Sequence, residues 1–119
     1  MKNEDVIVGA KFLLAESEDA EIDKKIQYFS QRRAHLPKGK SMGCVFKNPD
    51  NGFAGEYIEK CGLKGLRIGG ARISCQHANF IINDGKATAE EIKSLIDFIK
   101  NAVYAQYKVQ LEEEIRYLF

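Results

Sequence analysis

Asn79-Phe-Ile-Ile-Asn83 opens the stretch of sequence, residues 79–103, that decides the fold. Three apolar residues between asparagines are typical of a buried strand, and Asp84-Gly85 behind them is typical of a turn. Thr88-Ala-Glu-Glu91 then has the spacing of a capping box at the start of a helix. The apolar residues that follow recur at helical spacing, and they are Ile92, Leu95, Ile96, Ile99 and Val103. We therefore predict a buried strand, a turn and an amphipathic helix.

Two further elements are predicted upstream of this stretch. Residues 6–14 favour a strand, because β-branched and aromatic residues dominate them. The expected apolar face of this strand consists of Val6, Val8, Ala10, Phe12 and Leu14. Acidic residues from Glu16 onward suit the first turn of a helix, which is expected to end near Arg32-Arg33. The apolar stripe of that helix consists of Ile22, Ile26 and Phe29.

The middle of the chain is predicted to be less regular. Residues 34–52 hold both prolines and three glycines, with a short strand at residues 44–46. A second helix follows, capped by Asp50 or Asn51 and ended by Gly62. Its expected buried side consists of Phe53, Ala54, Tyr57, Ile58 and Cys61.

These elements together imply an α+β fold. Residues 113–119 alternate between apolar and polar, which adds another strand. Strands separated by helices in a chain of 119 residues favour a two-layer domain, with a small, mainly antiparallel sheet packed against about three helices. We expect residues 1–119 to form a single domain.

Composition argues against several classes of protein. A net charge of +1, from 18 Lys+Arg against 17 Asp+Glu, disfavours nucleic-acid and membrane-surface binding, which usually need a basic excess. The sequence has no apolar run near the roughly 20 residues that span a bilayer and no signal-peptide pattern, so we expect a cytoplasmic protein. An odd number of cysteines without a C-x-x-C pair disfavours a disulfide scaffold or a zinc site, and they are Cys44, Cys61 and Cys75.

Candidate chemistry begins in the irregular middle segment. Cys44 follows a glycine and precedes a polar loop containing Asn48, so its thiol could exchange a proton beside a bound ligand. The alternative interpretation is a packed free cysteine. The basic run Arg32-Arg33-Ala-His-Leu-Pro-Lys38-Gly-Lys40 could hold a phosphate, or it could be a solvated helix end and loop.

Two later places also carry reactive side chains. Cys75 and His77 would share one face of a strand, as a metal pair or a thiol–imidazole couple would, but two ligands do not make a zinc site. Glu114 and Arg116 would point together from the other face of the last strand, where a surface ion pair is the alternative.

Four stretches share their order with one known family. They are Ser41-Met-Gly-Cys-Val-Phe-Lys-Asn-Pro49, Ala54-Gly-Glu-Tyr-Ile-Glu-Lys-Cys-Gly-Leu-Lys-Gly-Leu-Arg-Ile-Gly-Gly-Ala71, His77-Ala-Asn-Phe-Ile-Ile-Asn-Asp-Gly-Lys-Ala-Thr88 and Leu111-Glu-Glu-Glu-Ile-Arg116. On these residues the chain resembles the C-terminal domain of UDP-N-acetylenolpyruvoylglucosamine reductase, the MurB family of peptidoglycan synthesis. The resemblance covers nearly all of the chain.

The resemblance implies a role in a flavoprotein oxidoreductase, UDP-N-acetylmuramate dehydrogenase. In that family NADPH reduces FAD, the flavin passes hydride to UDP-GlcNAc-enolpyruvate, and an enzyme residue protonates the intermediate to give UDP-MurNAc. The first two domains hold FAD and the third closes over the substrate. This chain would then be the third domain without the FAD-binding domains, its partners in the same enzyme. FAD and NADPH would belong to the full-length enzyme, and the isolated chain is expected to bind neither and to be inactive.

The resemblance also assigns residues. The family's proton donor falls on Cys44, and its catalytic glutamate falls on Glu114. Substrate-binding positions fall on Asn48, His77 and Arg116, which would hold the diphosphate and carboxylate groups. The family's phosphate-binding lysine does not align cleanly, so Lys38, Lys40 and His35 stay open as candidates.

Two other functions remain open at this point. One is a stand-alone uridine-nucleotide or anion-binding module without catalysis. The other is a thiol-dependent enzyme that uses Cys44 or Cys75 with a histidine.

Overall fold

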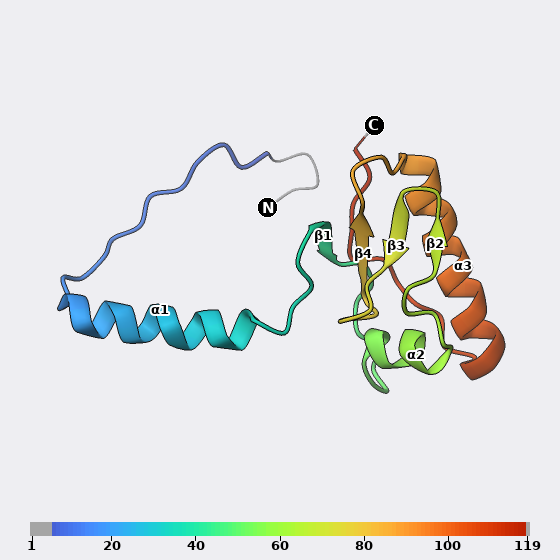
Figure 1. Cartoon of the computed structure of the whole chain (residues 1–119), viewed down its shortest axis with the longest axis horizontal. Helices are drawn as coiled ribbons and strands as arrows, with labels where there is room; N and C mark the ends of the chain where they lie inside the picture. The colour runs from blue at the N-terminus through green and yellow to red at the C-terminus, as the bar shows by residue number, and fades with distance from the viewer. Residues whose placement is uncertain (1–5, 119) are drawn as a thin grey trace. The chain divides into compact units, whose positions relative to one another are not determined.

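The computed structural model describes residues 6–118, which fall into two compact units, residues 6–34 and residues 35–118. Figure 1 shows the elements of each unit, coloured along the chain. That residues 1–119 form one domain stays a prediction. None of the helices in residues 6–118 combines the length and the apolar character needed to cross a membrane.

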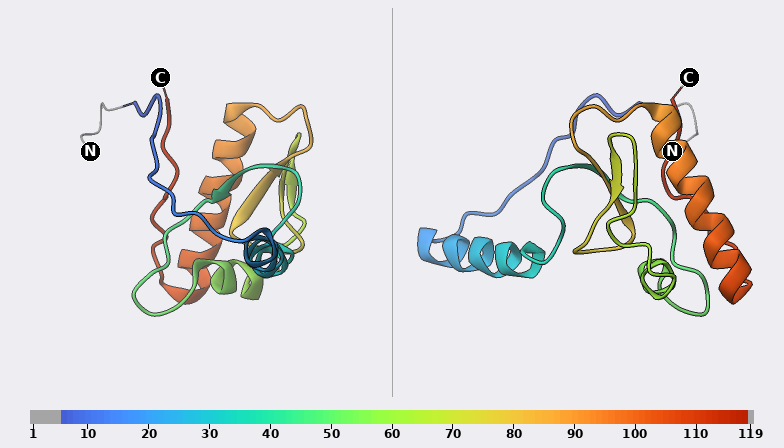
Figure 2. Two further views of the ribbon diagram at one scale, coloured as in Figure 1. Left: turned by 90° about the vertical axis from the view of Figure 1, so that its left-hand side faces the viewer. Right: turned by 45° about the vertical axis from the view of Figure 1, so that its right-hand side comes forward.

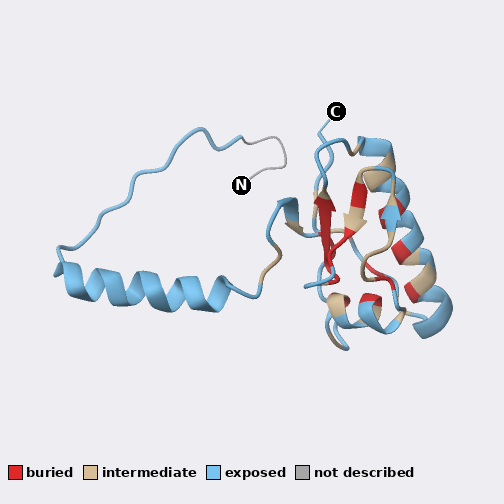
Figure 3. Cartoon of the chain, viewed as in Figure 1, coloured by how far each residue is buried: buried red, intermediate tan, exposed pale blue. Residues whose placement is uncertain are grey.

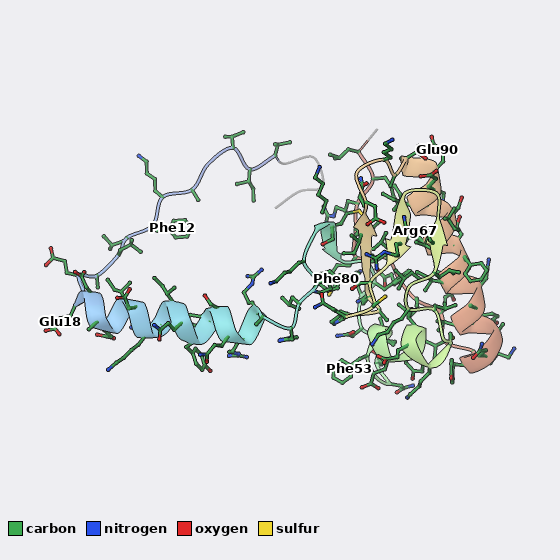
Figure 4. All side chains as sticks on the ribbon, in the orientation of Figure 1. Phe12, Glu18, Phe53, Arg67, Phe80 and Glu90 are labelled. Atoms are coloured by element: carbon green, nitrogen blue, oxygen red, sulfur yellow. The ribbon has the colours of Figure 1, made fainter. Side chains whose placement is uncertain are left out.

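The first unit begins with residues 6–18, which form neither helix nor strand. The strand predicted over residues 6–14 is therefore wrong. Its apolar side chains are exposed, Val8 to 97% and Leu14 to 82%, and Figure 4 shows the Phe12 ring standing away from the ribbon. A strand needs a neighbouring backbone to receive its hydrogen bonds, and the described residues of this unit supply none.

The predicted first helix is confirmed as α1, Asp19–Arg33. Acidic side chains lie in its first turn, and Arg32 and Arg33 lie in its last turn, which suits the helix dipole. The helix buries none of its residues, and its apolar stripe is exposed, with Ile26 and Phe29 each at 57% (Figure 3). The pattern therefore predicted the helix correctly, but within this unit the stripe has nothing to pack against.

The second unit contains a four-stranded antiparallel sheet in the order β1-β4-β3-β2. The strands are β1, Lys40–Cys44; β2, Arg67–Ile68; β3, Ala71–Ile73; and β4, Phe80–Asn83. Two helices share this unit, α2, Ala54–Lys60, and α3, Ala89–Tyr107. In Figures 1 and 2, α3 runs along one side of the sheet, where it contacts β2 and β3, and α2 contacts α3. The predicted α+β class is confirmed, with three helices and an antiparallel sheet in the chain.

The core of the second unit lies between α2, α3 and the sheet (Figure 3). The predicted stripe of α3 is confirmed, because Leu95, Ile96, Ile99 and Val103 are fully buried and Ile92 is partly buried. Burying each such side chain contributes about 1.5–3 kcal/mol. The capping box is also confirmed, since the Thr88 hydroxyl and the Glu91 carboxylate each accept a backbone N–H of the other residue.

Gly69 and Gly70 form the turn between β2 and β3, which packs against the start of α3. The N–H of Gly70 donates to the Glu91 carboxylate at 3.1 Å. A Cβ at Gly70 would lie 2.5 Å from the backbone nitrogen of Ala87, so only glycine fits there. The paired glycines therefore serve packing of the hairpin on the helix.

Several predicted boundaries are corrected. The strand predicted at residues 44–46 ends at Cys44 as β1, and Phe46 instead forms an isolated bridge with Glu113. Beyond that bridge, residues 114–118 form no strand, because no continuous backbone edge runs beside them, and Phe119 lies outside the described residues.

The start of the second helix also differs from the prediction. Phe53 is the residue before α2, and neither Asp50 nor Asn51 caps it. Asn48 satisfies an N-terminal donor from further away, since its side-chain oxygen accepts the N–H of Ala54 at 3.1 Å. The predicted end at Gly62 is confirmed by its positive φ of 71°.

Candidate functional site

A hollow of about 300 Å³ lies where the end of β1, the start of α2 and the turn between β3 and β4 meet. Its volume is at the lower end of the range for small-molecule sites. Phe53 stands at the start of α2 (Figure 4), and the Glu56 and Glu59 carboxylates line the same wall. The full lining is Cys44, Asn48, Phe53, Gly55, Glu56, Glu59, Gln76, His77, Ala78 and Asn79. Three of the predicted site residues, Cys44, Asn48 and His77, are therefore brought together.

Cys44 is the last residue of β1, and it pairs with Phe80 of β4. Gly43 before it has a φ of 85°, and the register of the two strands shifts between Ser41 and Cys44. Burial of the thiol raises its pKa, and the negative charge of Glu114 raises it further. The thiol therefore keeps its proton at neutral pH.

Glu114 reaches this region through a backbone bridge. Its N–H donates to the carbonyl of Val45 at 2.8 Å, next to the bridge between Phe46 and Glu113. The neighbouring Glu113 carboxylate accepts a hydrogen bond from the Lys100 ammonium of α3 at 2.9 Å. The segment that carries Glu114 is thus fixed to α3 on one side and to the chain beyond Cys44 on the other.

His77 lies in the turn before β4. Its Nδ1 accepts the N–H of Asn79 at 3.2 Å, which leaves Nε2 to carry the proton of the neutral ring. The ring lies edge-on to Phe80, with centroids 4.9 Å apart. Burial lowers the pKa of His77, and the positive charges of His35 and Lys64 lower it further. The neutral imidazole is therefore a hydrogen-bond donor at the edge of the hollow.

The predicted pairing of Cys75 with His77 on a strand face is wrong. β3 ends at Ile73, and the hydroxyl of Ser74 accepts the N–H groups of Gln76 and His77, which folds residues 74–77 into a turn. Cys75 is exposed, and its sulfur lies 3.7 Å from the Arg72 guanidinium. Residues 6–118 contain no group of three potential metal ligands.

Three predicted binding residues lie outside the hollow. Lys40 is the first residue of β1, at the opposite end of that strand from Cys44, and it lines a separate depression with Asn83. Lys38 is exposed in the loop before β1. Arg116 is exposed, and within the described residues it forms no ion pair with Glu114.

Comparison with known proteins matches this unit to one family. The profile described as UDP-N-acetylenolpyruvoylglucosamine reductase, C-terminal domain, matches residues 34–118. The chain belongs to this family. Its predicted membership is thereby confirmed.

Relatives and a solved structure extend the match. The chain is 47% identical to the UDP-N-acetylenolpyruvoylglucosamine reductase of Protochlamydia amoebophila over 94% of this chain and 38% of that protein. It is 44% identical to the reductase of Syntrophobacter fumaroxidans over 95% of this chain and 33% of that protein. The crystal structure of the Thermus caldophilus reductase (MurB) matches with a TM-score of 0.67 and 40% identity, over 84% of this chain and 36% of that chain. The chain thus spans less than two-fifths of the length of these reductases.

In this reductase domain, the structure also places residues that sequence reasoning missed. Gly55 lets the start of α2 approach the imidazole, because a Cβ there would lie 3.2 Å from Cε1 of His77. Glu56 and Glu59 give the hollow a carboxylate wall. The helical pattern placed both carboxylates on α2, but nothing in the sequence indicated which side of α2 would face Cys44.

Proposed function

We propose that this chain is the substrate-binding domain of a UDP-N-acetylmuramate dehydrogenase and supplies half of its active site. The reaction is the NADPH- and FAD-dependent reduction of UDP-GlcNAc-enolpyruvate to UDP-MurNAc in peptidoglycan synthesis. The observation that carries the proposal is the protonated Cys44 thiol beside Glu114, at a hollow that Asn48 and His77 also line. Family membership supports the choice of substrate.

Cys44 is the proposed proton donor. After hydride has reached one carbon of the enolpyruvyl double bond, the neighbouring carbon takes up the proton of the thiol. A general acid must hold its proton until that moment, and the Glu114 charge favours the protonated thiol. Glu114 would also stabilise the enol intermediate or assist its protonation.

Asn48 and His77 are the proposed binding residues within the hollow. Neutral His77 can donate from Nε2 to a substrate oxygen, since its Nδ1 is already used as an acceptor. The carboxylates of Glu56 and Glu59 repel anions, so uncharged sugar hydroxyls suit that wall better than a diphosphate does. The diphosphate and carboxylate are then left to the cations outside the hollow, namely Arg116, Lys38, Lys40 and His35.

The described residues do not fit FAD. The one paired-glycine turn is closed by the Glu91 carboxylate and the backbone of Ala87, so a diphosphate would meet a negative charge and no free space. The hollow near Cys44 carries two further carboxylates on one wall. We therefore assign FAD, with NADPH, to the FAD-binding domains of the same enzyme, and we expect this chain alone to be inactive in NADPH oxidation.

The proposal is tested first by binding. UDP-GlcNAc-enolpyruvate is titrated into the isotope-labelled 119-residue chain, and amide and side-chain NMR signals are followed. Asn48, His77 and Arg116 should shift, whereas Asn101 on the outer part of α3 serves as an internal control and should not. A titration that leaves the three residues unchanged while other signals shift would contradict the proposed site.

Catalysis is tested in a domain exchange. Residues 34–118 replace the matching region of the Thermus caldophilus reductase, and substrate-dependent NADPH oxidation is measured. Cys44→Ala should lower kcat by about 10²–10⁴-fold, because a general acid is lost, whereas Cys44→Ser should retain more activity. Cys75→Ser is the matched control and should be neutral. Substrate binding without any activity in a correctly folded, flavin-loaded chimera would favour the non-catalytic nucleotide-binding module instead.

A further inference from the structure

Asn79 is a buried polar residue whose side chain has no part in the proposed chemistry. It precedes β4, and only 3% of it is exposed. Its Oδ1 accepts the N–H of Phe46 at 2.9 Å, and its Nδ2 donates to the C=O of Phe46 at 2.8 Å. One carboxamide therefore satisfies both backbone polar groups of a residue that is itself 1% exposed.

Phe46 lies where the chain changes its neighbour. Up to Cys44, the chain pairs with β4. Beyond it, the chain pairs with residues 112–114, since the N–H of Lys47 donates to the C=O of Glu112 at 2.9 Å and the C=O of Val45 accepts from Glu114. The polar groups of Phe46 point to the opposite side, past the start of β4, where no ladder continues.

Leaving those groups unpaired would be costly. A buried backbone donor or acceptor without a partner loses about 1–3 kcal/mol in stability, so such groups are almost always satisfied. Asn79 therefore stands in for the missing strand at the position where residues 45–47 leave the sheet.

The other side of residues 45–47 is fixed independently. Leu111, at 2% exposure, anchors the C-terminal segment in the core, and the Lys100–Glu113 ion pair ties it to α3. Residues 45–47 thus lie between two fixed supports, the Asn79 carboxamide and residues 112–114. Cys44 precedes this short span, and Glu114 is held to it through Val45.

We propose that Asn79 is a positioning residue that fixes the Cys44 thiol against the Glu114 carboxylate by holding the backbone of Phe46. The proposal rests on the proposed function only in treating Cys44 and Glu114 as the working pair. Asn79 acts through the main chain of Phe46. Without its two hydrogen bonds, the Phe46 backbone moves to find other partners and the end of β1 moves with it.

The test reads the ionisation of the Cys44 thiol in the 119-residue chain, with neither substrate nor flavin present. Iodoacetamide alkylation of the Cys44 peptide is followed by mass spectrometry across a pH series, which gives the thiol pKa because only the thiolate reacts. Glu114→Gln sets the scale for removal of the carboxylate. Asn79→Ala should lower the thiol pKa in the same direction and raise alkylation at pH 7.5 severalfold.

The double variant decides whether Asn79 acts through Glu114. Asn79→Ala combined with Glu114→Gln should react no faster than Glu114→Gln alone, because the carboxylate is already gone. If the two increases multiply instead, Asn79 controls the exposure of the thiol and its proposed role is overturned. An unchanged thiol pKa in Asn79→Ala, with stability reduced, would also overturn it.

Two controls separate positioning from general loss of stability. Asn83→Ala removes the two hydrogen bonds that the Asn83 side chain accepts, at 2.7 and 3.1 Å, at the other end of β4, and should leave Cys44 alkylation unchanged. Asn79→Ser keeps a hydroxyl for one of the two bonds and gives an intermediate result if Asn79→Ala does not fold. A failure of substrate binding or of the chimera would leave this result intact, so the two proposals fail separately.

Discussion

Residues 6–34 and residues 35–118 carry equally regular apolar patterns, and only the second unit buries them. Ile26 of α1 is 57% exposed, whereas Ile96 of α3 is fully buried, although each belongs to a stripe with helical spacing. Val8, predicted in a strand, is 97% exposed, whereas Ile81 of β4 is 2% exposed. Periodicity therefore states which face of an element is apolar, and a second surface decides whether that face is buried.

The comparison is tested most strongly by removing one isoleucine from each helix. Ile96→Ala should lower the free energy of unfolding by about 2–5 kcal/mol, because it leaves a cavity in the core. Ile26→Ala should change it by less than about 0.5 kcal/mol. Urea unfolding followed by circular dichroism measures both. Equal losses would show that the stripe of α1 is buried in solution.

A pair of glycines sharpens the comparison at the level of the backbone. Gly70→Ala should destabilise the chain by about 1–3 kcal/mol, because its new Cβ meets the backbone at Ala87. Gly9→Ala should be neutral, since nothing lies within 4 Å of a Cβ at that position. Thermal unfolding of the two variants provides the measurement, and a destabilising Gly9→Ala would reveal a packed environment around residues 6–14.

The smallest expected effect concerns two glutamates near helix starts. Hydrogen bonds from the side chains of Lys25 and Ser17 lower the pKa of Glu21, whereas backbone N–H groups of Thr88 and Gly70 lower that of Glu91. In both cases the ionised form is favoured in the folded state. The stabilisation is therefore present above the ordinary glutamate pKa and is lost as pH falls through the lowered one.

Salt should separate these two glutamates. At about 1 M NaCl the screening length falls to about 3 Å, so the pKa of Glu21 should return toward its ordinary value. The pKa of Glu91 should stay low, because its partners are fixed amide dipoles within the capping box. NMR titration of the side-chain carboxyl signals measures both, with Lys25→Gln as the control for Glu21. Equal salt responses would contradict this distinction.

Much of the second unit could be predicted because its signals are local. The capping box, the stripe of α3 and the strand at residues 80–83 each depend on neighbours within a few residues. The strand predicted at residues 6–14 failed because strand formation depends on a partner that the pattern does not contain. The bridge between Phe46 and Glu113 was missed for the same reason, since its two sides lie far apart in the sequence.

The site was predictable by resemblance, and spacing alone left Cys44, Asn48, His77 and Glu114 without a common location. Spacing also suggested a strand pair of Cys75 and His77 that the turn at Ser74 prevents. Asn79 was interpreted as the residue that ends a strand, and its burial depends on Phe46, which no local pattern connects to it.

The bridge between Phe46 and Glu113 has a consequence for the timing of folding. Closing a loop of that length is entropically expensive, so the contact forms only after the local elements have paired. Whenever residues 111–116 detach, the Glu114 charge leaves Cys44 and the thiol ionises more readily. The reactivity of this one sulfur therefore serves as a clock for local opening, since each alkylation event records a moment when the last segment was undocked.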